Sequence, residues 1–444
     1  MLAGGLGVLA SASFLSPTQA QSSDALLNKL VEKGILTTKE ANDLREESQK
    51  DSAKSYRKAT GMPDWVSSLR FHGDLRLRYD QISGDNPALV DRHRFRYRAR
   101  FGFTAVMKED FEVGLRLASG EPAAGPTVFG NPISNNTTFE ENGAGKPVHI
   151  NLVYAQWSLL KNKQWSMTMT GGKMENPFVF SDILFDPDYT PEGLAQQWAY
   201  KFNDPHAAKF NVGGFFLDEV SGRGSDPLMA AAQLRLDSAW TTKFHSSVGI
   251  SGLAITGEEN LRNENVPNQN RGNTRVNVGS ATAPVFIPGV NFNPIVLDGS
   301  VTYSLDSFPL YPGAFPIRVG GDYVNNLAIS EKNEAHSVGF TLGKSGKKGT
   351  WDLTYRWKNV GADSWFEEFL DSDTGAFYES AAFGGSAGYG AGTNLRGHWI
   401  KANYSPYNSL TIGLTYYLFD LIDEVPSRSD SRAARILLDA IWKF

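Results

Sequence analysis

Hydrophobic side chains occupy every second position along most of this chain, which is the period of a β-strand with one apolar face. In the sequence DLRLRYD, Leu75, Leu77 and Tyr79 alternate with aspartate and arginine. Residues 351–358 repeat the pattern late in the chain, with aromatic residues and leucine set against charged residues and threonine. Because the alternation begins near Ser67 and continues to the C-terminus, it predicts one large β structure.

The connections between these strands alternate in length. Tight turns are expected near residues 108–110, 161–164, 241–243, 345–349 and 406–408. Longer polar loops are expected near 119–147, 175–193, 218–227, 256–293, 325–335, 361–393 and 420–431. This alternation indicates antiparallel hairpins whose short turns lie on one side and whose long loops lie on the other, as in outer-membrane barrels.

The pattern predicts sixteen strands, an even number as expected for a single-chain bacterial barrel. They begin near residues 67, 92, 109, 148, 164, 194, 208, 228, 243, 294, 315, 335, 350, 394, 408 and 432. A soluble β-sandwich would also alternate, but its apolar faces would meet in one core. Here the polar face carries charged residues in nearly every strand, so we predict an all-β, sixteen-stranded antiparallel transmembrane barrel over residues 63–444, apolar outside and polar inside.

Residues 1–20 are typical of a secretion signal. An apolar run from Leu2 to Leu15 is followed by Pro17 and a small-residue site that ends at Ala20. Beyond this segment, no window reaches the roughly 18 apolar residues that a transmembrane helix needs.

Residues 21–62 have helical spacing instead of the period of two. Gly34 is placed to end a first helix, and Thr37 with Glu40 matches a capping box that begins a second. The apolar stripe is too thin to bury a core alone. This helical leader is therefore either an oligomerising coiled coil or a solvated extension.

Composition limits the possible chemistry. The chain has no cysteine, which excludes disulfides, zinc-thiolate sites and a cysteine nucleophile. The 7 histidines are scattered without metal-ligand spacing. Residues 384–388 read GGSAG and match G-x-S-x-G, but they lie in a glycine-rich loop instead of the strand–turn–helix that this motif requires. We predict no cofactor, no metal site and no enzymatic activity.

The stretch RHRFRYRARFGF, residues 92–103, places arginine at alternate positions with aromatic residues between them. Such interleaving also occurs in nucleic-acid grooves, but a net charge of −5 argues against a nucleic-acid partner. In a barrel, each arginine held against lipid near mid-bilayer would cost about 2–4 kcal/mol. The arginines are therefore expected to point inward.

The neighbouring strands extend this run into a basic wall that lines the pore. Its members are Arg76, Arg78, Arg94, Arg96, Arg98, Arg100 and Arg116, with Asp74, Asp80 and Glu112 as counter-charges on the same face. We expect Arg94, Arg96 and Arg98 to lie at the narrowest point. The alternative is that the charges only stiffen the wall.

The end of the chain points to a family. Trp442 and Phe444 close an alternating apolar strand, which resembles the C-terminal assembly signal of bacterial outer-membrane proteins. Together with LLNKLVEKGILTTKEANDLR in the leader, GKMENPFVFSDILFDPDYTPEGLA after the fifth strand and the final DAIWKF, the chain resembles the putative porins of Gram-negative outer membranes. It is more loosely similar to the phosphate- and carboxylate-type porins.

The resemblance implies a sixteen-stranded barrel, usually a homotrimer, inserted by the barrel-assembly machinery, with its third external loop folded into the lumen. That loop offers acids to oppose the arginines: Glu175, Asp182, Asp186, Asp188 and Glu192. In some relatives the leader forms a periplasmic coiled coil.

The expected function is passive diffusion of small hydrophilic solutes across the outer membrane, favouring anionic or zwitterionic ones. Two alternatives remain open: a channel selective for phosphate, carboxylates or sugars, and a plugged structural or adhesive barrel.

Overall fold

A computed structural model describes residues 63–444 except 87–89, 122–129, 204, 223, 268–270, 376–391 and 425–429, and also residues 29–30, 33, 37, 40–41, 43–44 and 61. The expected signal segment 1–20, most of the leader 21–62 and the GGSAG match at 384–388 lie outside the described residues. The chain divides into two compact units, Met1–Ser67 and Ser68–Phe444.

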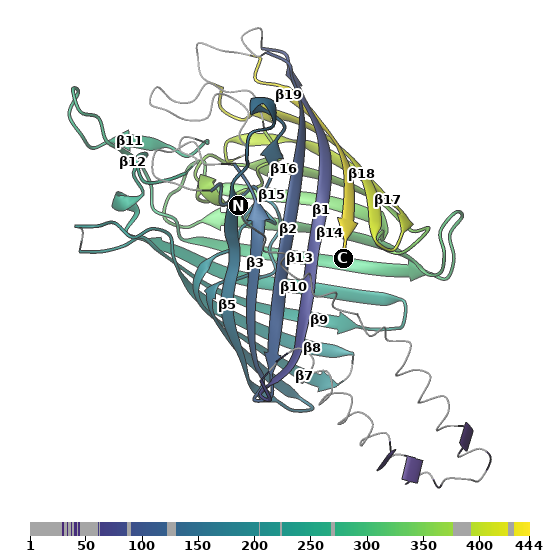
Figure 1. The fold of residues 1–444 in the computed structure, drawn as a ribbon. Coiled ribbons are helices and arrows are strands. Elements are labelled where there is room, and N and C mark those ends of the chain that lie inside the picture. The colour runs from purple at the N-terminus through teal and green to yellow at the C-terminus, as the bar shows by residue number, and fades with distance from the viewer. Residues whose placement is uncertain are drawn as a thin grey trace, which may run out of the picture. The chain divides into compact units, whose positions relative to one another are not determined.

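Sixteen long antiparallel strands form a closed barrel, as the alternating pattern predicted. They are β1 (Val66–Gly84), β2 (Arg92–Met107), β3 (Phe111–Ser119), β5 (Val148–Lys161), β6 (Trp165–Lys173), β7 (Glu192–Asn203), β8 (His206–Phe216), β9 (Leu228–Ala239), β10 (Phe244–Thr256), β13 (Pro294–Leu305), β14 (Phe315–Asn326), β15 (Glu334–Gly343), β16 (Trp351–Val360), β17 (Leu395–Tyr407), β18 (Leu410–Leu421) and β19 (Ala433–Lys443). Figure 1 shows β1 running between β2 and the last strands of the chain.

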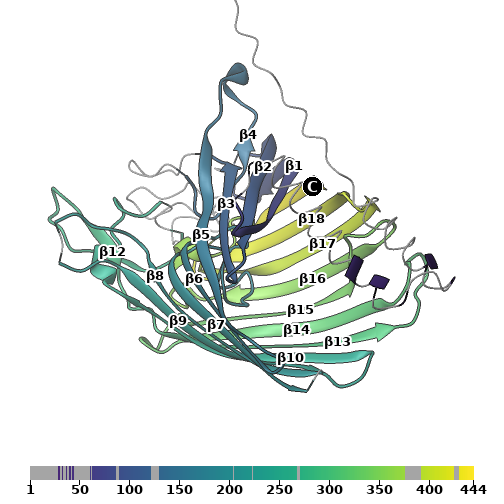
Figure 2. The ribbon, with the colours of Figure 1, turned by 60° about the horizontal axis from the view of Figure 1, so that its bottom comes forward.

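The barrel closes between its first and last strands. β19 pairs with β1 from Asp74 opposite Lys443 to Gly84 opposite Ala433. Phe444 extends this ladder with two further backbone bonds to Gly73, of 2.9 and 3.1 Å. Each remaining strand pairs with its neighbours in the barrel, so the wall is continuous, and Figure 2 shows its curvature from β5 round to β18. Because the barrel is closed, the backbone N–H and C=O groups at every strand edge have a neighbouring strand to pair with, as lipid requires.

The connections carry small additional elements that the sequence pattern did not predict. A two-residue strand, β4 (Thr137–Thr138), lies in the β3–β5 loop and pairs with β2. The β10–β13 loop contains the hairpin of β11 (Arg275–Asn277) and β12 (Phe286–Pro288), which stands away from the wall in Figure 1. Three short 3-10 helices are η1 (Glu141–Gly143), η2 (Glu258–Asn260) and η3 (Glu367–Phe369).

The outer face of the wall is apolar, and aromatic pairs lie near the strand ends that carry the short turns. Phe95 and Phe101 of β2 are 60% and 51% exposed, as expected for side chains that face lipid. The Trp165 and Tyr200 rings lie 4.6 Å apart, and the Phe111 and Trp157 rings 5.0 Å apart. Such aromatic girdles mark the interfaces of transmembrane barrels.

Three long connections fold inward. They are L3 (residues 174–191), L5 (257–293) and L7 (361–394, of which 376–391 are outside the described residues). Phe185 of L3, Phe292 of L5 and Trp365 of L7 belong to one buried apolar cluster, with ring centroids 6.1–6.2 Å apart. Residues on the inner faces of β7–β10 and β13–β19 also belong to this cluster. The inward folding of L7 was not expected from the sequence.

In the leader, the described residues include the expected capping box. The backbone N–H of Glu40 donates to Thr37 Oγ1 at 3.2 Å, and the backbone N–H of Thr37 donates to Glu40 Oε2 at 2.8 Å. Within the described part of the chain, no helix has the length and apolarity to cross a membrane.

Candidate functional site

The arginines of β2 lie on the inner face of the barrel and are tied to carboxylates. Arg98 donates to Asp74 at 2.9 Å and to Asp188 of L3 at 3.0 Å. Arg100 reaches the same two carboxylates at 2.6 and 3.3 Å. Two cations and two carboxylates therefore form one neutral cluster that attaches L3 to the wall.

A second cluster joins β2 to the last strand and to L7. Asp80 accepts from Arg94 at 2.7 Å and from Arg435 of β19 at 2.8 Å. Arg96 lies more loosely, 3.8 Å from Asp80 and 3.6 Å from Glu121. The cluster therefore links the first two strands to the strand that closes the barrel.

Arg78 of β1 is the most enclosed arginine of the expected wall. It donates to Asp439 of β19 at 2.7 Å and to Asp373 of L7 at 2.9 Å, with its side chain 3% exposed. Asp373 also lies 3.5 Å from Arg435. One carboxylate of L7 thus bridges two buried guanidinium groups on the wall.

Two members of the expected wall differ from the rest. Arg116 of β3 donates to Asn151 and to Glu175, whose side chain is largely exposed. Arg76 donates to the side-chain oxygen of Asn136 at 2.7 Å and makes no ion pair with any described carboxylate, although it is 8% exposed. Its Nε has no hydrogen-bond partner among the described residues.

The expected loop acids divide into different environments. Only Glu175 and Asp188 contact the predicted basic wall, and they do so by direct ion pairs, not across the gap that we expected. Asp182 instead accepts from Arg356 at 2.9 Å and Lys358 at 3.0 Å of β16.

Asp186 and Glu192 make no ion pair with a described arginine. Asp186 accepts from the backbone N–H of Ser372 in L7 at 2.7 Å. Glu192 is the first residue of β7 and pairs with Lys173, with its side chain 64% exposed. Of the five acids predicted to oppose the arginines, Glu175 and Asp188 thus pair with the predicted basic wall, and the other three have different partners.

Burial and neighbouring charges shift the pKa values of the loop carboxyls in different directions. Burial, reinforced by Asp188 and Asp371, raises the pKa of Asp186 well above its usual value. Burial also raises the pKa of Asp371 to about 6, against the opposing attraction of Lys358. Burial acts in the same direction at Asp182, but Lys358 and Arg356 outweigh it and lower the pKa of this carboxyl to about 2. Carboxyls of the inward loops therefore differ in pKa according to whether a buried cation lies beside them.

A cavity of about 290 Å³ lies between L3, L7 and the wall formed by β1, β2, β17 and β18. The wall contributes Arg76, Arg78, Arg98, Trp399, Lys401, Thr415 and Tyr417. Arg94 and Arg96, which we had expected at the narrowest point, do not line it. Sequence reasoning also missed Lys401, Arg435, Asp439 and Asp373. The period of two in β19 would have placed Arg435 and Asp439 on the inner face, whereas no sequence signal identified L7.

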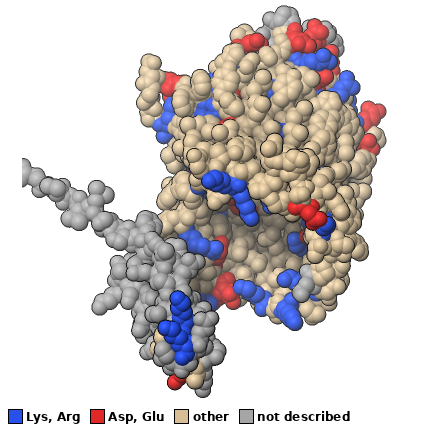
Figure 3. All heavy atoms as spheres, turned by 90° about the vertical axis from the view of Figure 1, so that its right-hand side faces the viewer, with Lys and Arg blue, Asp and Glu red and all other residues tan. Residues whose placement is uncertain are grey.

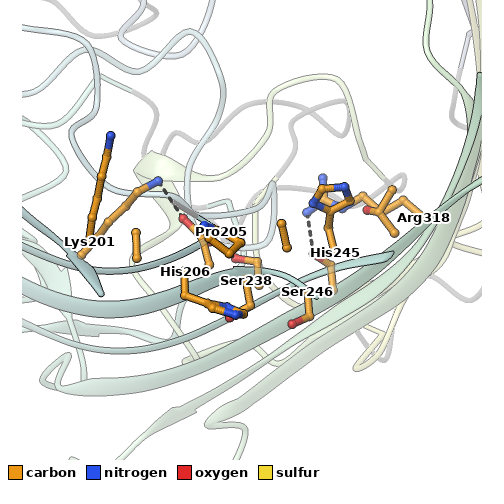
Figure 4. Close-up of a pocket in the computed structure, with 14 residues that line it drawn as sticks. Lys201, Pro205, His206, Ser238, His245, Ser246 and Arg318 are labelled. Carbon is orange, nitrogen blue, oxygen red and sulfur yellow. Dashed lines mark hydrogen bonds and ion pairs between the residues drawn. The ribbon is translucent and has the colours of Figure 1, made fainter. Parts of the chain in front are cut away.

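The opposite wall carries a second group of charges. A cavity of about 450 Å³ is lined there by Lys201, Lys209, Asp237, His245 and Arg318, among others. Figure 4 shows Lys201, His245 and Arg318 rising to one side of the strands. The space-filling view of Figure 3 shows a hollow in the molecule bordered by basic and acidic side chains. In the described residues, no group of three or more histidines and carboxylates is arranged to hold a metal ion.

The C-terminal residues lie on the outer face beside β1. Trp442 is opposite Leu75, and the Phe444 ring covers Gly73, where an added Cβ would lie 2.6 Å from it. Phe444 is 69% exposed. The last aromatic residue thus seals the seam between the first and last strands.

Comparison with known proteins agrees with this geometry. Residues 85–221 match a family described as "Putative porin". No curated protein matches the sequence. The structure of Pseudomonas putida OprB at high pH has a TM-score of 0.51 and 9% identity, and the match covers 85% of this chain and 94% of that one.

Two other solved structures are similar at lower scores. Salmonella typhi OmpF, in complex with daunomycin, has a TM-score of 0.45 and 10% identity, with 85% of this chain and 97% of that chain covered. The outer membrane channel DcaP of Acinetobacter baumannii has a TM-score of 0.43 and 12% identity, with the same coverage. At these identities the neighbours bear on the fold alone, and of these three structures OprB, with a TM-score above 0.5, supports it.

The resemblance to the putative porin family, expected from the sequence, is therefore confirmed over residues 85–221. The family match and the closed sixteen-stranded barrel together indicate an outer-membrane location and a general channel rather than an enzyme.

Proposed function

We propose that this protein is an outer-membrane porin through which small hydrophilic solutes diffuse passively in a Gram-negative bacterium. The observation that carries the proposal is the inversion of the usual arrangement: apolar, aromatic side chains outside a closed barrel, and charged side chains inside it. A polar interior of this kind is stable when it is filled with water, and it then provides a path for polar solutes.

The proposed solutes are anionic or zwitterionic. Four cations support this preference, because they have no carboxylate partner among the described residues: Arg76 and Lys401 on one wall, Lys201 and Arg318 on the other. The paired arginines contribute less, because a neighbouring carboxylate cancels most of their charge at a distance. The remaining acids, among them Asp182 and Asp188, would orient dipolar solutes instead of repelling every anion.

Electrical recording across a planar bilayer tests both the porin proposal and the anion preference. The purified protein in a planar bilayer should give discrete conductance steps, and a potassium chloride gradient should give a reversal potential of the sign for anion preference. No steps at all would overturn the porin proposal. Steps with a reversal potential favouring cations would overturn the anion preference and leave the channel intact.

A second function has a specific observation in its favour. The apolar cluster of L3, L5 and L7 occupies the interior near the long loops, as a plug would in a structural or adhesive barrel. A plugged barrel would fold and give no steady conductance, whereas a porin would conduct around the loops. A selective channel would be distinguished by conductance that saturates with one solute.

The assembly is also proposed, not established. The family resemblance favours a homotrimer inserted by the barrel-assembly machinery, with Trp442 and Phe444 as the recognised C-terminal signal. The helical leader 21–62 would lie in the periplasm. Chemical crosslinking of the protein in outer-membrane vesicles would show a trimer as one band of three times the monomer mass.

A further inference from the structure

On the part of the inner wall formed by β1, β2 and β16–β19, nearly all described inward charges are paired, and two cations there are exceptions. Arg78, Arg94, Arg96 and Arg435 are matched by Asp80, Glu121, Asp373 and Asp439. Arg98 and Arg100 are matched by Asp74 and Asp188, and Arg356 and Lys358 have Asp182 as a shared partner. Arg76 and Lys401 have no carboxylate partner among the described residues.

These two cations line the same cavity. Arg76 projects from β1 and Lys401 from β17, and both border the space of about 290 Å³ beneath L3 and L7. Arg76 is 8% exposed, so water does not fully solvate its charge. A buried guanidinium without a counter-charge is unfavourable, and an anion in the cavity would supply that charge.

Neutral hydrogen-bond donors surround the two cations. The Thr415 and Tyr417 hydroxyls lie on β18 along the same cavity and make no hydrogen bond to any described residue. The Nε1 of Trp399 is buried without a hydrogen-bond partner in the part of the chain that the structure describes. Unpaired buried donors are rare in native proteins, and here they border the space next to two unpaired cations.

The carboxylates on the loop side of the cavity are held by other partners. Asp188 and Asp373 are already engaged with the arginines of the wall. Asp186 accepts from the backbone N–H groups of Ser372 and Asp188. Asp371 lies 3.8 Å from Lys358, on the side of β16.

From this charge pattern we infer that Arg76 and Lys401, with Trp399, Thr415 and Tyr417, form a binding site for one small oxyanion, a carboxylate or a phosphate group. The site deepens the proposed porin function and rests on it for access from both sides of the membrane. The volume suits a single small solute, since ordinary ligand pockets begin near roughly 300 Å³. Such a site would hold a solute briefly on its passage, as conduction requires.

The test is a titration of single-channel chloride current with inorganic phosphate, succinate or glucose. Phosphate and succinate should reduce the current along a saturating curve, and glucose at the same concentration should not. The phosphate and succinate arms show which oxyanion is preferred. Arg76→Gln and Lys401→Gln should each raise the half-blocking concentration at least tenfold.

Lys163→Gln is the matched control. It removes a cation that also lacks a described carboxylate partner, but Lys163 is solvent-exposed in the β5–β6 turn and does not line this cavity. Its half-blocking concentration should equal that of the wild type. Equal block of the wild type and both cavity variants, or equal block by glucose, would overturn the site.

Isothermal titration calorimetry of the folded protein in detergent separates this site from the transport proposal. Saturable heat with phosphate or succinate that is lost in Arg76→Gln supports the site even if no conductance is seen. Conductance without saturable heat or block would overturn the site and leave the porin standing. Heat-modifiable gel mobility confirms that each variant is folded.

Discussion

At the scale of single residues, ion pairing decides which interior charges a solute meets. Arg78 and Arg98 were expected to attract anions, yet each is held by two carboxylates. Arg76, two residues before Arg78 on β1, donates to Asn136 and has no carboxylate partner among the described residues. The period of two places all three on the inner face, but it contains no information about which carboxylates fold back to meet them.

Asp373→Asn should destabilise the barrel and strengthen its preference for anions. The carboxylate bridges buried Arg78 and Arg435, so its loss leaves charge without compensation and should cost about 3–5 kcal/mol of unfolding free energy. The reversal potential should move further toward anions, and the temperature at which gel mobility shifts should fall. Asp306→Asn is the control, because Asp306 pairs with Lys243 at an exposed turn. Equal effects of the two substitutions would contradict the bridging role.

Asp371 should make stability depend on pH. Its pKa of about 6 in the folded protein lies above its usual value of 3.8, so the folded state binds the proton more tightly. The stabilising contribution of Asp371 to the free energy of unfolding is therefore present below about pH 4 and is lost as pH rises through about 6. Asp371→Asn should stabilise the barrel relative to the wild type more at pH 7 than at pH 4, by on the order of 1–2 kcal/mol. An identical difference at both pH values, measured by heat-modifiable mobility, would refute this.

At the scale of elements, the strands could be predicted from the sequence because a strand between lipid and a polar interior needs different residues on its two faces. The predicted beginnings at 92, 148, 228, 294 and 315 coincide with β2, β5, β9, β13 and β14, and the others differ by one or two residues. A residue facing lipid must be apolar and its neighbour facing the interior need not be, so the period is preserved even in short strands.

The loops were less predictable, because inside the barrel they are held by contacts distant in sequence. Asp373 of L7 meets Arg78 across 295 positions, and Asp182 of L3 meets Lys358 across 176. Neither ion pair produces a recognisable pattern among residues that are close in sequence. The family resemblance suggested an inward L3, whereas nothing suggested that L7 also folds in or that β11 and β12 form a separate hairpin.

Deletion of Phe444 should impair closure of the barrel. The residue contributes two backbone hydrogen bonds to Gly73, and its ring covers the seam. We expect a lower folded fraction in heat-modifiable gel mobility and a lower yield in the outer membrane. Gly73→Val should act in the same direction, because a Cβ there would also lie 2.5 Å from the carbonyl oxygen of Arg100. Phe95→Ala, an exposed ring elsewhere on the wall, should change little; if it is as harmful as the deletion, the seam has no special role.

At the scale of the whole molecule, the barrel should fold without its leader. Residues 68–444 form their own compact unit, and all sixteen strands pair within the barrel. Removal of residues 21–62 behind an intact secretion signal should therefore preserve heat-modifiable mobility and single-channel conductance. A leader-deleted protein that does not conduct, although it is folded, would show that the leader forms part of the pathway.

The order of the strands also governs how errors in synthesis are detected. Besides β2, the strand β1 pairs only with the last dozen residues of the chain, from Ala433 to Phe444. A chain that ends one hairpin early leaves two open edges, and unpaired backbone groups are not tolerated in hydrocarbon. Insertion is thus close to all-or-none, and a prematurely terminated chain would remain outside the bilayer as a substrate for proteolysis.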